Sequence, residues 1–472
     1  MTTNKIPAKQ VYMETMGCFK NQYDSEIMLS SLVRGGFNIV AKPELADLLV
    51  INTCAFLSEA AYESINRILA LSKYKKKSAK SPLNFPPKLV VVGCLASRYK
   101  DKLLDEIPEI DAIMGTSDYT LVVPLLEEVI NRIDVNNQSK LAKIPQKYNS
   151  PKPVYQFDNI VTSPIAINQG HLRFLKIAEG CSNACSFCNI PLLRGEQVSR
   201  PSGHILAEFN QFLDWGVKEI NILSQNTSSY GFDQPKAIRH NLADLIEKMI
   251  TSRKNKSDYW LRVLYSYPNH YPKEIFSMMA QYPSLVPYID MPFQHINDVI
   301  LKKMNRRITK HKIVSLLDTA FQILPDLSLR STFIVGFPGE TSEMFAELYD
   351  FINQKYFHHI GVFTYSEEDN IKSRKYKDDV PQEEKMNRQK TLLDLQNKIS
   401  NKRNIAYIGK TVQVLVDKQN SKHNFTARTA NQAFEVDGIT TLKDMHQKAV
   451  VGSFAKVKIT KASGHDLWGE LV

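Results

Sequence analysis

Cys181-Ser-Asn-Ala-Cys185-Ser-Phe-Cys188 is the stretch of this 472-residue chain that decides its fold and its chemistry. Thiolates at this spacing suit a soft metal site. A complete four-iron cluster takes four cysteines, so three leave one iron open for a small molecule. Zinc is the alternative, but zinc motifs usually bring a second cysteine pair or nearby histidines. No histidine lies close to this stretch, which therefore indicates an iron–sulfur site with one open position.

A series of alternating strand and helix candidates begins just before this motif, at Leu172. About six βα units predict a barrel or partial barrel, with its active site at the carboxyl ends of the strands. The first strand would deliver the cysteines to that end. The strand candidates are Arg173–Ile177, Glu219–Leu223, Trp260–Tyr265, Tyr288–Met291, Leu329–Val335 and His359–Phe363.

The N-terminal region shows the same alternation, which predicts an α/β domain with a parallel sheet. Each of its three strand candidates ends just before a cysteine: Cys18, Cys54 or Cys94. The carboxyl ends of parallel strands share one edge of a sheet, so we expect these three thiols to converge. The alternative is three unrelated buried cysteines. The strand candidates are Gln10–Glu14, Asp47–Asn52 and Lys88–Val92, and the helix candidates are Asp24–Arg34 and Ser58–Ser72, the second capped by Ser58.

Two stretches are predicted to connect domains or elements. The C-terminal region differs from the rest because its predicted elements are mostly short strands. Lys73–Lys88 is predicted to be a solvated loop, with a specific RNA contact as the alternative. Proline-rich residues from about 136 to 169 form a linker. A charged helix candidate, Gln382–Asn404, precedes short strands that predict a small OB-like β-barrel. These strand candidates are Lys410–Asp417, Ala433–Val436 and Ala455–Thr460.

The composition is that of a soluble globular protein, with 43% hydrophobic and 23% charged residues. No apolar run approaches the ~20 residues of a membrane span. Met1 to Gln10 lacks the apolar segment of a signal peptide, so we expect a cytoplasmic protein with reduced cysteines. The net charge of +11 and the pI near 9.1 fit contact with nucleic acid, but also a soluble basic protein without such a partner.

The cysteine motif, with Phe187 at its aromatic place, resembles the signature of radical S-adenosylmethionine enzymes. The resemblance implies a four-iron, four-sulfur cluster on Cys181, Cys185 and Cys188. The open iron would hold the amino and carboxylate groups of S-adenosylmethionine, which one electron breaks into methionine and a 5′-deoxyadenosyl radical. The protein would orient cofactor and substrate and exclude quenching solvent.

The same resemblance implies cofactor contacts for Phe187, Gln225, Arg262, Gly336 and Gly339. The two glycines follow an apolar strand and allow close approach of backbone to a ligand, although a plain turn would also place them there. Arg262 can instead be a salt-bridge residue, and Gln225 can simply cap the next element.

Two other residue sets have a functional and a structural interpretation. His295 is a proton relay or, as we favour, a packed core histidine. Lys302-Lys303 with Arg306-Arg307 is a binding patch or, as we favour, a solvated face.

Asn52-Thr-Cys54 and Val92-Gly-Cys94, with Cys18 before them, resemble the N-terminal domain of methylthiotransferases. In that family these three cysteines hold a second four-iron, four-sulfur cluster whose open iron carries sulfur. The C-terminal region resembles the TRAM domain that ends these enzymes. The implied domains are 1–140 for the auxiliary cluster, a linker at 141–170, 171–403 for the radical core and 404–472 for TRAM.

Several segments are similar to the branch that modifies an aspartate of the twelfth small-subunit ribosomal protein. The rival branch acts on an adenosine of transfer RNA. It tends to have an arginine soon after the second N-terminal cysteine and Gln-Ser-Gly where Gln294-His295 stands, and neither is present here. Asn226 is a departure, because an aspartate is usual there. The segments are Asn52-Thr-Cys-Ala-Phe56, Ile190-Pro-Leu-Leu-Arg-Gly195, Ser224-Gln-Asn-Thr227, Leu261-Arg-Val-Leu-Tyr-Ser-Tyr-Pro268, Asp290-Met-Pro-Phe-Gln-His295 and Ser331-Thr-Phe-Ile-Val-Gly-Phe-Pro-Gly-Glu340.

The resemblance implies β-methylthiolation of that aspartate with two molecules of S-adenosylmethionine, one giving the methyl group and one the radical. The partners would be the ribosomal protein, an electron donor and a sulfur donor, with RNA contact secondary and no membrane. From residue 404 to 472 there are nine Lys or Arg and six Asp or Glu, which suits a protein loop better than RNA. The alternatives are a transfer-RNA adenosine methylthiotransferase and a non-catalytic metal-bearing RNA-binding or assembly protein.

Overall fold

The computed structural model describes residues 9–76, 86–135, 169–253, 258–354, 356–445 and 448–472, together with positions 148, 155, 157, 160, 162 and 165–167. Residues 1–8, positions 77–85 of the lysine-rich loop and most of the linker at 141–170 lie outside the described residues. The chain forms two compact units. Unit 1 comprises Met1–Ile167, Glu179–Ser182 and Asn189–Val198, and unit 2 comprises Asn168–Ala178, Asn183–Cys188 and Ser199–Val472.

Unit 1 is built on a parallel sheet in the order β2-β1-β3-β4-β5. The strands are β1 (Gln10–Thr15), β2 (Asn38–Ile39), β3 (Leu48–Thr53), β4 (Lys88–Gly93) and β5 (Ala112–Met114). The helices are α1 (Phe19–Arg34), α2 (Ser58–Ser72), α3 (Cys94–Tyr99), α4 (Asp101–Glu106), α5 (Val122–Val135) and α6 (Ile190–Arg194). The parallel α/β prediction for this region is confirmed.

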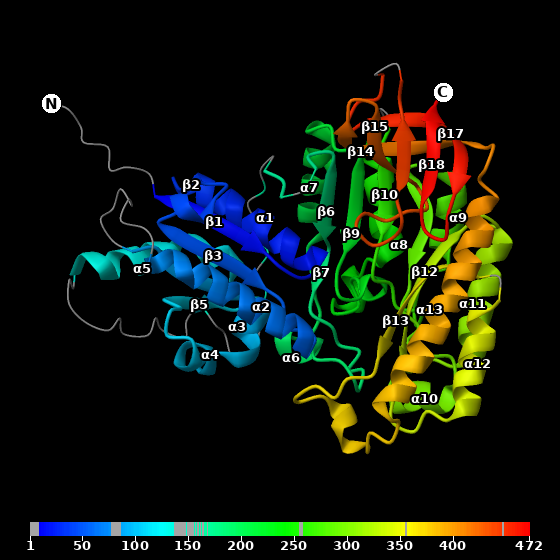
Figure 1. Cartoon of the computed structure of the whole chain (residues 1–472), viewed down its shortest axis with the longest axis horizontal. Helices are drawn as coiled ribbons and strands as arrows, with labels where there is room; N and C mark the ends of the chain where they lie inside the picture. Colours follow the sequence, from blue (N-terminus) through cyan, green and yellow to red (C-terminus); the bar gives the residue numbers. More distant parts are fainter. Residues whose placement is uncertain are drawn as a thin grey trace. The chain divides into compact units, whose positions relative to one another are not determined.

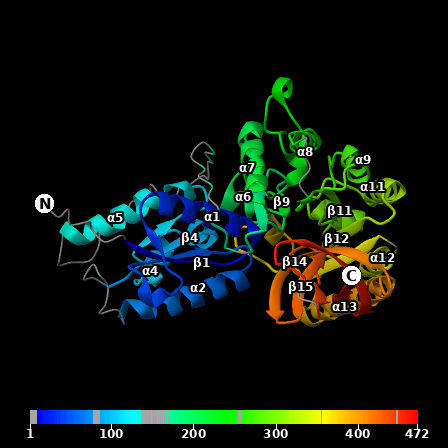
Figure 2. The same cartoon turned by 90° about the horizontal axis from the view of Figure 1, so that it is seen from above.

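The sheet of unit 1 is covered on both faces, which explains its apolar strands. All six residues of β3 are buried, as expected for a parallel strand between two helical layers. Figure 2 shows α1 and α5 along one face and α2 along the other. α2 starts where the sequence predicts, but Ser58 is not its cap, because Leu57 occupies that position without a side-chain hydrogen bond.

The start of α1 differs from the prediction. The helix begins at Phe19, five residues before the expected Asp24. Its first turns carry buried polar residues, among them Lys20, Asn21 and Gln22. Apolar periodicity cannot reveal turns of this kind, since their polar side chains contact other polar groups instead of an apolar core.

Unit 2 contains an open sheet of parallel strands in the order β13-β12-β11-β10-β9-β6, with helices packed outside it (Figure 1). This is the partial barrel that the sequence predicts. The strands are β6 (Leu172–Lys176), β9 (Glu219–Leu223), β10 (Trp260–Val263), β11 (Leu285–Asp290), β12 (Ser328–Val335) and β13 (Phe357–Thr364). The helices are α7 (Ser202–Asp214), α8 (Leu242–Thr251), α9 (Glu274–Gln281), α10 (Asp298–Lys303), α11 (Lys310–Ile323), α12 (Ser342–Ile352) and α13 (Gln382–Ile405). Short β7 (Ala178–Glu179) and β8 (Val198–Ser199) form a separate two-stranded sheet.

The C-terminal part of unit 2 is a closed five-stranded barrel, which confirms the predicted small β-barrel. One predicted strand is wrong, because Ala433–Val436 forms turns. The Asp437 carboxylate accepts the N–H of Ala433 at 2.9 Å, and Glu435 has a left-handed φ of 54°, so the backbone cannot extend. The strands are β14 (Thr411–Ser421), β15 (Asn424–Thr429), β16 (Thr440–Lys443), β17 (Phe454–Ala462) and β18 (Leu467–Leu471).

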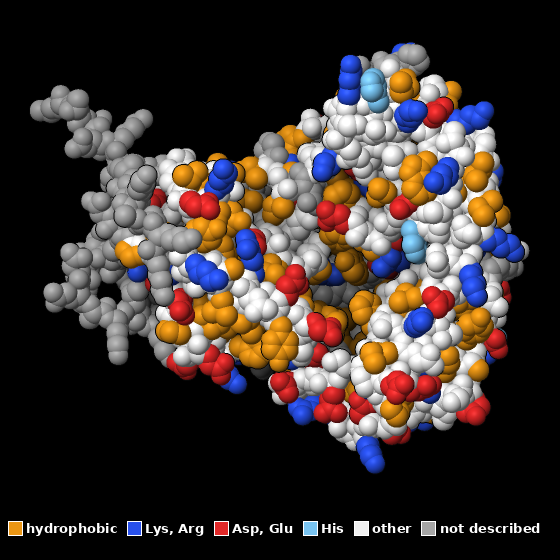
Figure 3. Space-filling model, in the orientation of Figure 1, with side chains coloured by type: hydrophobic (Ala, Val, Ile, Leu, Met, Phe, Trp, Pro, Cys, Tyr) orange, Lys and Arg blue, Asp and Glu red, His pale blue; other side chains and the backbone are white. Residues whose placement is uncertain are grey.

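The charge of the molecule is spread over its surface. On the face shown in Figure 3, Lys and Arg side chains are interspersed with Asp and Glu, so the +11 charge does not gather there in one basic patch. A helix both long and apolar enough to cross a membrane does not occur in the described part of the chain.

Candidate functional site

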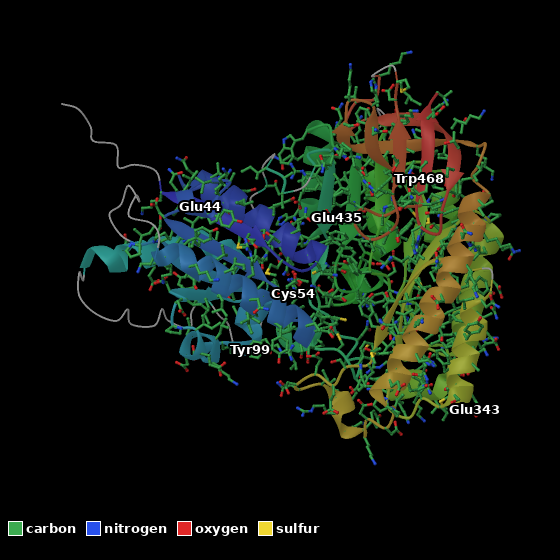
Figure 4. The ribbon with its side chains drawn as sticks, in the orientation of Figure 1. Glu44, Cys54, Tyr99, Glu343, Glu435 and Trp468 are labelled. Atoms are coloured by element: carbon green, nitrogen blue, oxygen red, sulfur yellow. The ribbon has the colours of Figure 1, made fainter. Side chains whose placement is uncertain are left out.

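Three cysteines of unit 1 stand at the carboxyl ends of neighbouring parallel strands. Cys54 follows β3 directly, Cys94 is the first residue of α3 directly after β4, and Cys18 precedes α1 shortly after β1. Because β1, β3 and β4 are adjacent and parallel, all three lie at one edge of the sheet, where Figure 4 labels Cys54. This is the convergence expected from the order of the strands.

Close backbone packing holds these loops together. Gly17 has φ of 91°, and a Cβ added there would lie 2.6 Å from the Cβ of Cys54 and 3.1 Å from its Sγ. Only glycine fits this position, so the Cys18 loop lies directly against Cys54. Asn21 ties the loops further, because its Nδ2 donates to the carbonyls of Met16 and Thr53, each at 2.9 Å.

The three thiols lie within each other's electrostatic field. Burial raises the pKa of Cys94 to about 12, and negative charge on Cys54 and Cys18 acts in the same direction. Burial and the charge of Cys18 likewise raise the pKa of Cys54. At Cys18, desolvation is outweighed by the charges of Lys20 and Arg194, and the pKa is lowered. Each of these thiolates is therefore easier to form when positive charge is close.

Arg194 supplies such a charge, and the sequence analysis did not single it out as a site residue. It ends α6 and is only 1% exposed. Its Nη2 lies 3.8 Å from the Sγ of Cys94, and its charge favours the thiolate form of all three cysteines. The only signal in the sequence is the place of Arg194 within Ile190–Gly195, a segment similar to the branch that modifies the ribosomal protein.

The second cysteine motif lies in a loop, and residues Asn183–Cys188 of this loop are held by other segments of unit 2. Cys185 is buried, whereas Cys181 and Cys188 are half-buried. Ala184 has a left-handed φ of 50°, and its carbonyl accepts a hydrogen bond from Asn305 Nδ2 at 2.9 Å. The Ser186 hydroxyl donates to the carbonyl of Lys303 at 2.9 Å. The last residue of α10 and the residues that follow it therefore shape this loop.

Arg306 belongs to that segment and is buried, so the prediction of a solvated face is wrong for this residue. Its Nη1 lies 3.7 Å from the Sγ of Cys185. Its guanidinium lies 4.0 Å from the centre of the Tyr267 ring and donates to the carbonyl of Pro292. Like the N-terminal cysteines, this motif has a buried arginine next to a buried thiol.

The structure places two of the predicted cofactor contacts near the strand ends of unit 2. Phe187 is half-buried against an apolar cluster that includes Met304 and Phe337. Gln225 is half-buried just after β9, and its neighbour Asn226 is buried. Both predicted residues stand where barrels of this kind bind ligands.

Arg262 on β10 is wholly buried in an ion pair. Its Nε lies 2.9 Å from the Glu219 carboxylate, and its Nη1 donates to the carbonyl of Ala430 at 2.8 Å. Arg428 pairs with the same carboxylate at 2.7 Å. Burial alone would raise the pKa of Glu219, but the charges of Arg428 and Arg262 outweigh it and lower the pKa. The salt bridge that we considered as the alternative role of Arg262 is thus present.

The two glycines after β12 lie against lysine side chains. Gly336 has φ of 69°, and an added Cβ would lie 2.2 Å from Cγ of Lys385. Gly339 has φ of 80°, and its Cβ would lie 2.1 Å from Nζ of Lys303. A tight turn packed against lysines accounts for glycine at both places, and this was the alternative to ligand contact.

His295 has the surroundings of a packed core histidine. It is wholly buried, and its Nδ1 accepts the N–H of Asn297 at 3.0 Å. Its Nε2 lies 3.8 Å from Oε1 of Glu340, which in turn lies 3.4 Å from Arg388. Burial fits the structural interpretation that we favoured, but within the described part of the chain Nε2 of His295 and Oε1 of Glu340 make no hydrogen bond, so the proton relay stays a prediction.

The cysteine side chains can be tested for their fit to a single metal ion and to an iron–sulfur cluster. Among the described residues, no three His, Cys, Asp or Glu side chains are arranged to hold a single metal ion. An iron–sulfur cluster makes a different demand, because each thiolate binds its own iron. Three converging thiols next to a buried cation fit such a cluster, since thiolates are its ligands and the cation favours their formation.

Three family models match the chain. Residues 10–115 match an uncharacterized protein family, UPF0004, residues 175–352 match the Radical SAM superfamily, and residues 408–472 match the TRAM domain. Among solved structures, the radical S-adenosylmethionine methyltransferase TsrM from Kitasatospora setae gives a TM-score of 0.53 at 14% identity, covering 75% of this chain and 73% of that one. The cobalamin-dependent enzyme OxsB gives 0.52 at 12% identity, covering 82% and 56%. At these identities the two structures show the fold alone.

Full-length relatives are more similar. Ribosomal protein uS12 methylthiotransferase RimO from Clostridioides difficile is 36% identical over 463 residues, which cover 98% of this chain and 99% of the relative. The protein of that name from Thermoanaerobacter is 37% identical over 466 residues, covering 98% and 100%. The Synechocystis protein is 37% identical over 462 residues, covering 96% of both. The chain belongs to the family of ribosomal protein uS12 methylthiotransferases, which are radical S-adenosylmethionine enzymes.

Proposed function

We propose that this protein methylthiolates the β-carbon of an aspartate in ribosomal protein uS12, using S-adenosylmethionine and two four-iron, four-sulfur clusters. The observation that carries the proposal is the convergence of three thiols at one sheet edge in a chain that also has the radical motif. A radical enzyme with one cluster has no use for a second set of three cysteines. The full-length relatives support uS12 as the substrate.

Each cysteine set has its own proposed role. Cys181, Cys185 and Cys188 hold the cluster that binds S-adenosylmethionine, and Cys18, Cys54 and Cys94 hold the cluster that carries sulfur. When bound, these groups supply the radical and the sulfur for the reaction. The chain provides buried thiols, and it shields Cys94 and Cys185 from water.

The proposed contacts to S-adenosylmethionine remain Phe187, Gln225, Arg262, Gly336 and Gly339. Phe187 offers a ring and Gln225 a polar amide at the strand ends. Since Arg262 is committed to Glu219, any loss of cofactor binding in an Arg262 variant has to be separated from loss of folding.

A cavity beside Cys18 offers a path to the auxiliary site. It has a volume of about 540 Å³ and lies where β1 ends, and Cys18 is an exposed residue. We propose that the uS12 loop or the sulfur donor reaches the auxiliary cluster from this side. The cavity is lined by Glu14, Thr15, Met16, Gly17, Glu63, Asn66 and Arg67.

The remaining partners follow from the chemistry. A radical cluster needs an electron donor, and each turnover consumes sulfur, so a sulfur-donating protein is required. We propose that the enzyme acts in the cytoplasm, because its proposed substrate is a ribosomal protein. RNA contact is secondary in this proposal, because the charge of residues 404–472, nine Lys or Arg against six Asp or Glu, suits a protein loop better than RNA.

Mass spectrometry of a deletion strain tests the substrate. We expect uS12 to lose its methylthio-aspartate while transfer RNA keeps its methylthio-adenosine, and plasmid-borne wild-type protein to restore the modification. Loss on transfer RNA alone would instead identify the adenosine enzyme. No loss on either molecule, together with one bound zinc per chain, would indicate a non-catalytic metal protein.

A further inference from the structure

Arg194 connects the two cysteine motifs along the chain. It lies six residues after Cys188, yet its segment, Asn189–Val198, folds as part of unit 1. The preceding segment, Glu179–Ser182, also belongs to unit 1. The first cysteine of the radical motif, Cys181, and the segment after the motif therefore fold in the same unit as the N-terminal cysteines.

The guanidinium of Arg194 is fixed by two carboxylates and one amide. Nη1 lies 2.8 Å from Oε1 of Glu179 and 3.3 Å from Oδ2 of Asp24. Nη2 donates to Oδ1 of Asn21 at 2.7 Å and lies 3.2 Å from Asp24. This arrangement leaves Nη2 as the group that also faces the Sγ of Cys94, at 3.8 Å.

All of these partners are buried, and this decides how strongly the charge acts. Asn21 and Glu179 are fully buried, and Asp24 is 4% exposed. Charges interact more strongly away from water, and dissolved salt screens buried charges little. Negative charge added to the cysteine site would therefore be stabilised by Arg194 and opposed by Asp24 and Glu179.

We propose that Arg194 is a positioning residue of the auxiliary cluster: its fixed positive charge, oriented by Asp24 and Glu179, makes reduction of the cluster on Cys18, Cys54 and Cys94 more favourable. This inference rests on the proposed function, because it requires the auxiliary cluster. Arg194 also makes the radical-motif segment part of that cluster's surroundings. The rival explanation is that Arg194 only neutralises the two buried carboxylates.

The test is a redox titration of full-length protein, reconstituted anaerobically with iron and sulfide and followed by electron paramagnetic resonance. A Cys185→Ala protein measured in parallel identifies the auxiliary signal. Arg194→Gln removes the charge, so we expect reduction to become about tenfold less favourable, a shift of ~59 mV to more negative potential for one electron. Arg194→Lys keeps the charge and should recover most of the shift.

Two further variants separate charge from packing. Asp24→Asn removes a negative charge with little change of shape, so it should shift the potential in the opposite direction. Arg200→Gln is the matched control, since Arg200 is also buried and pairs with Glu208 at 2.7 Å, but in unit 2. It should leave the auxiliary potential unchanged.

The outcomes decide between the explanations. An unchanged potential in Arg194→Gln, or a negative shift in Asp24→Asn, would overturn the inference. If Arg194→Gln loses the auxiliary cluster while Arg194→Lys keeps it, Asp24→Asn decides: a shift to more positive potential supports the inference, and an unchanged potential overturns it. If both variants lose the cluster, packing is the cause and the inference is wrong. Only about four irons in the wild type would instead contradict the proposed function itself.

Discussion

The two cysteine sites differ in how they are assembled and in how their nearby charge is balanced. Cys18, Cys54 and Cys94 are far apart in sequence and meet because three parallel strands end at one edge. Cys181, Cys185 and Cys188 come from one loop that is shaped by hydrogen bonds from the side chains of Ser186 and Asn305 to backbone carbonyls. The first site depends on the whole sheet of unit 1, and the second depends on one loop and the segment at the end of α10 that holds it.

Each site has one buried arginine near a buried thiol, but the two arginines have different partners. Arg194 pairs with the carboxylates of Asp24 and Glu179. In the described part of the chain, Arg306 contacts the Pro292 carbonyl and the Tyr267 ring instead of a carboxylate. One cation is balanced by opposite charge and the other is held by neutral groups, so their removal should have different consequences.

The largest expected effect separates the two cysteine sets. Cys185→Ala should abolish cleavage of S-adenosylmethionine, because it removes a ligand of the radical cluster. Cys94→Ala should spare cleavage and abolish sulfur insertion. Chromatography of 5′-deoxyadenosine and mass spectrometry of uS12 measure the two steps. Sulfur insertion by Cys94→Ala would contradict the separate roles of the two cysteine sets.

Removal of Arg194, whose charge is balanced by two carboxylates, should have the next largest effect. Arg194→Leu removes the cation that pairs with two buried carboxylates, and breaking a buried ion pair costs about 3–5 kcal/mol. Hydrogen exchange of α1 peptides measures this locally in unit 1. Asp24→Asn and Glu179→Gln added to Arg194→Leu should recover much of the loss. No recovery would mean that uncompensated charge is not the cause.

Removal of Arg306, which is held by neutral groups, should lower stability less. Arg306→Leu leaves no buried charge behind and loses a cation–π contact and a hydrogen bond to a carbonyl, about 2 kcal/mol in all. Urea unfolding followed by exchange of peptides from unit 2 measures it. A cost equal to that of Arg194→Leu would remove the distinction between the two arginines.

The smallest effect concerns a surface pair of unit 1. Arg67 is 41% exposed at its side chain and pairs with Glu14. Water and salt screen exposed pairs, so Arg67→Gln should change stability by only about 0–1 kcal/mol. Thermal unfolding at low and high salt is the measurement. A loss of stability above about 2 kcal/mol would mean that the Arg67–Glu14 pair contributes more than an exposed pair should.

Much of the fold was predictable because apolar strands and turn residues alternate strongly. The strands that became β1, β3, β4 and β9 were found nearly to the residue, and their order brings the N-terminal thiols together. The C-terminal barrel was predicted in kind, although β15, β16 and β18 were missed. Polar residues or glycine interrupt the apolar pattern in these three strands, Asn424–Thr429, Thr440–Lys443 and Leu467–Leu471, so the pattern is weak.

The polar parts of the sites were not predictable. Arg194 and Arg306 look like ordinary surface arginines in sequence, since burial of a charge depends on partners that are distant along the chain. Asp24 lies 170 residues before Arg194. The buried first turn of α1 was missed for the same reason, because its side chains serve the cysteine site instead of the apolar core.

Iron and sulfide content of the anaerobically reconstituted full-length protein tests the two-site account most directly. The account predicts about eight irons per wild-type chain and about four in a variant with Cys18, Cys54 and Cys94 all changed to alanine. A variant with Cys181, Cys185 and Cys188 changed should also retain about four. A wild-type chain with only about four irons, or a first variant that still holds about eight, would contradict it.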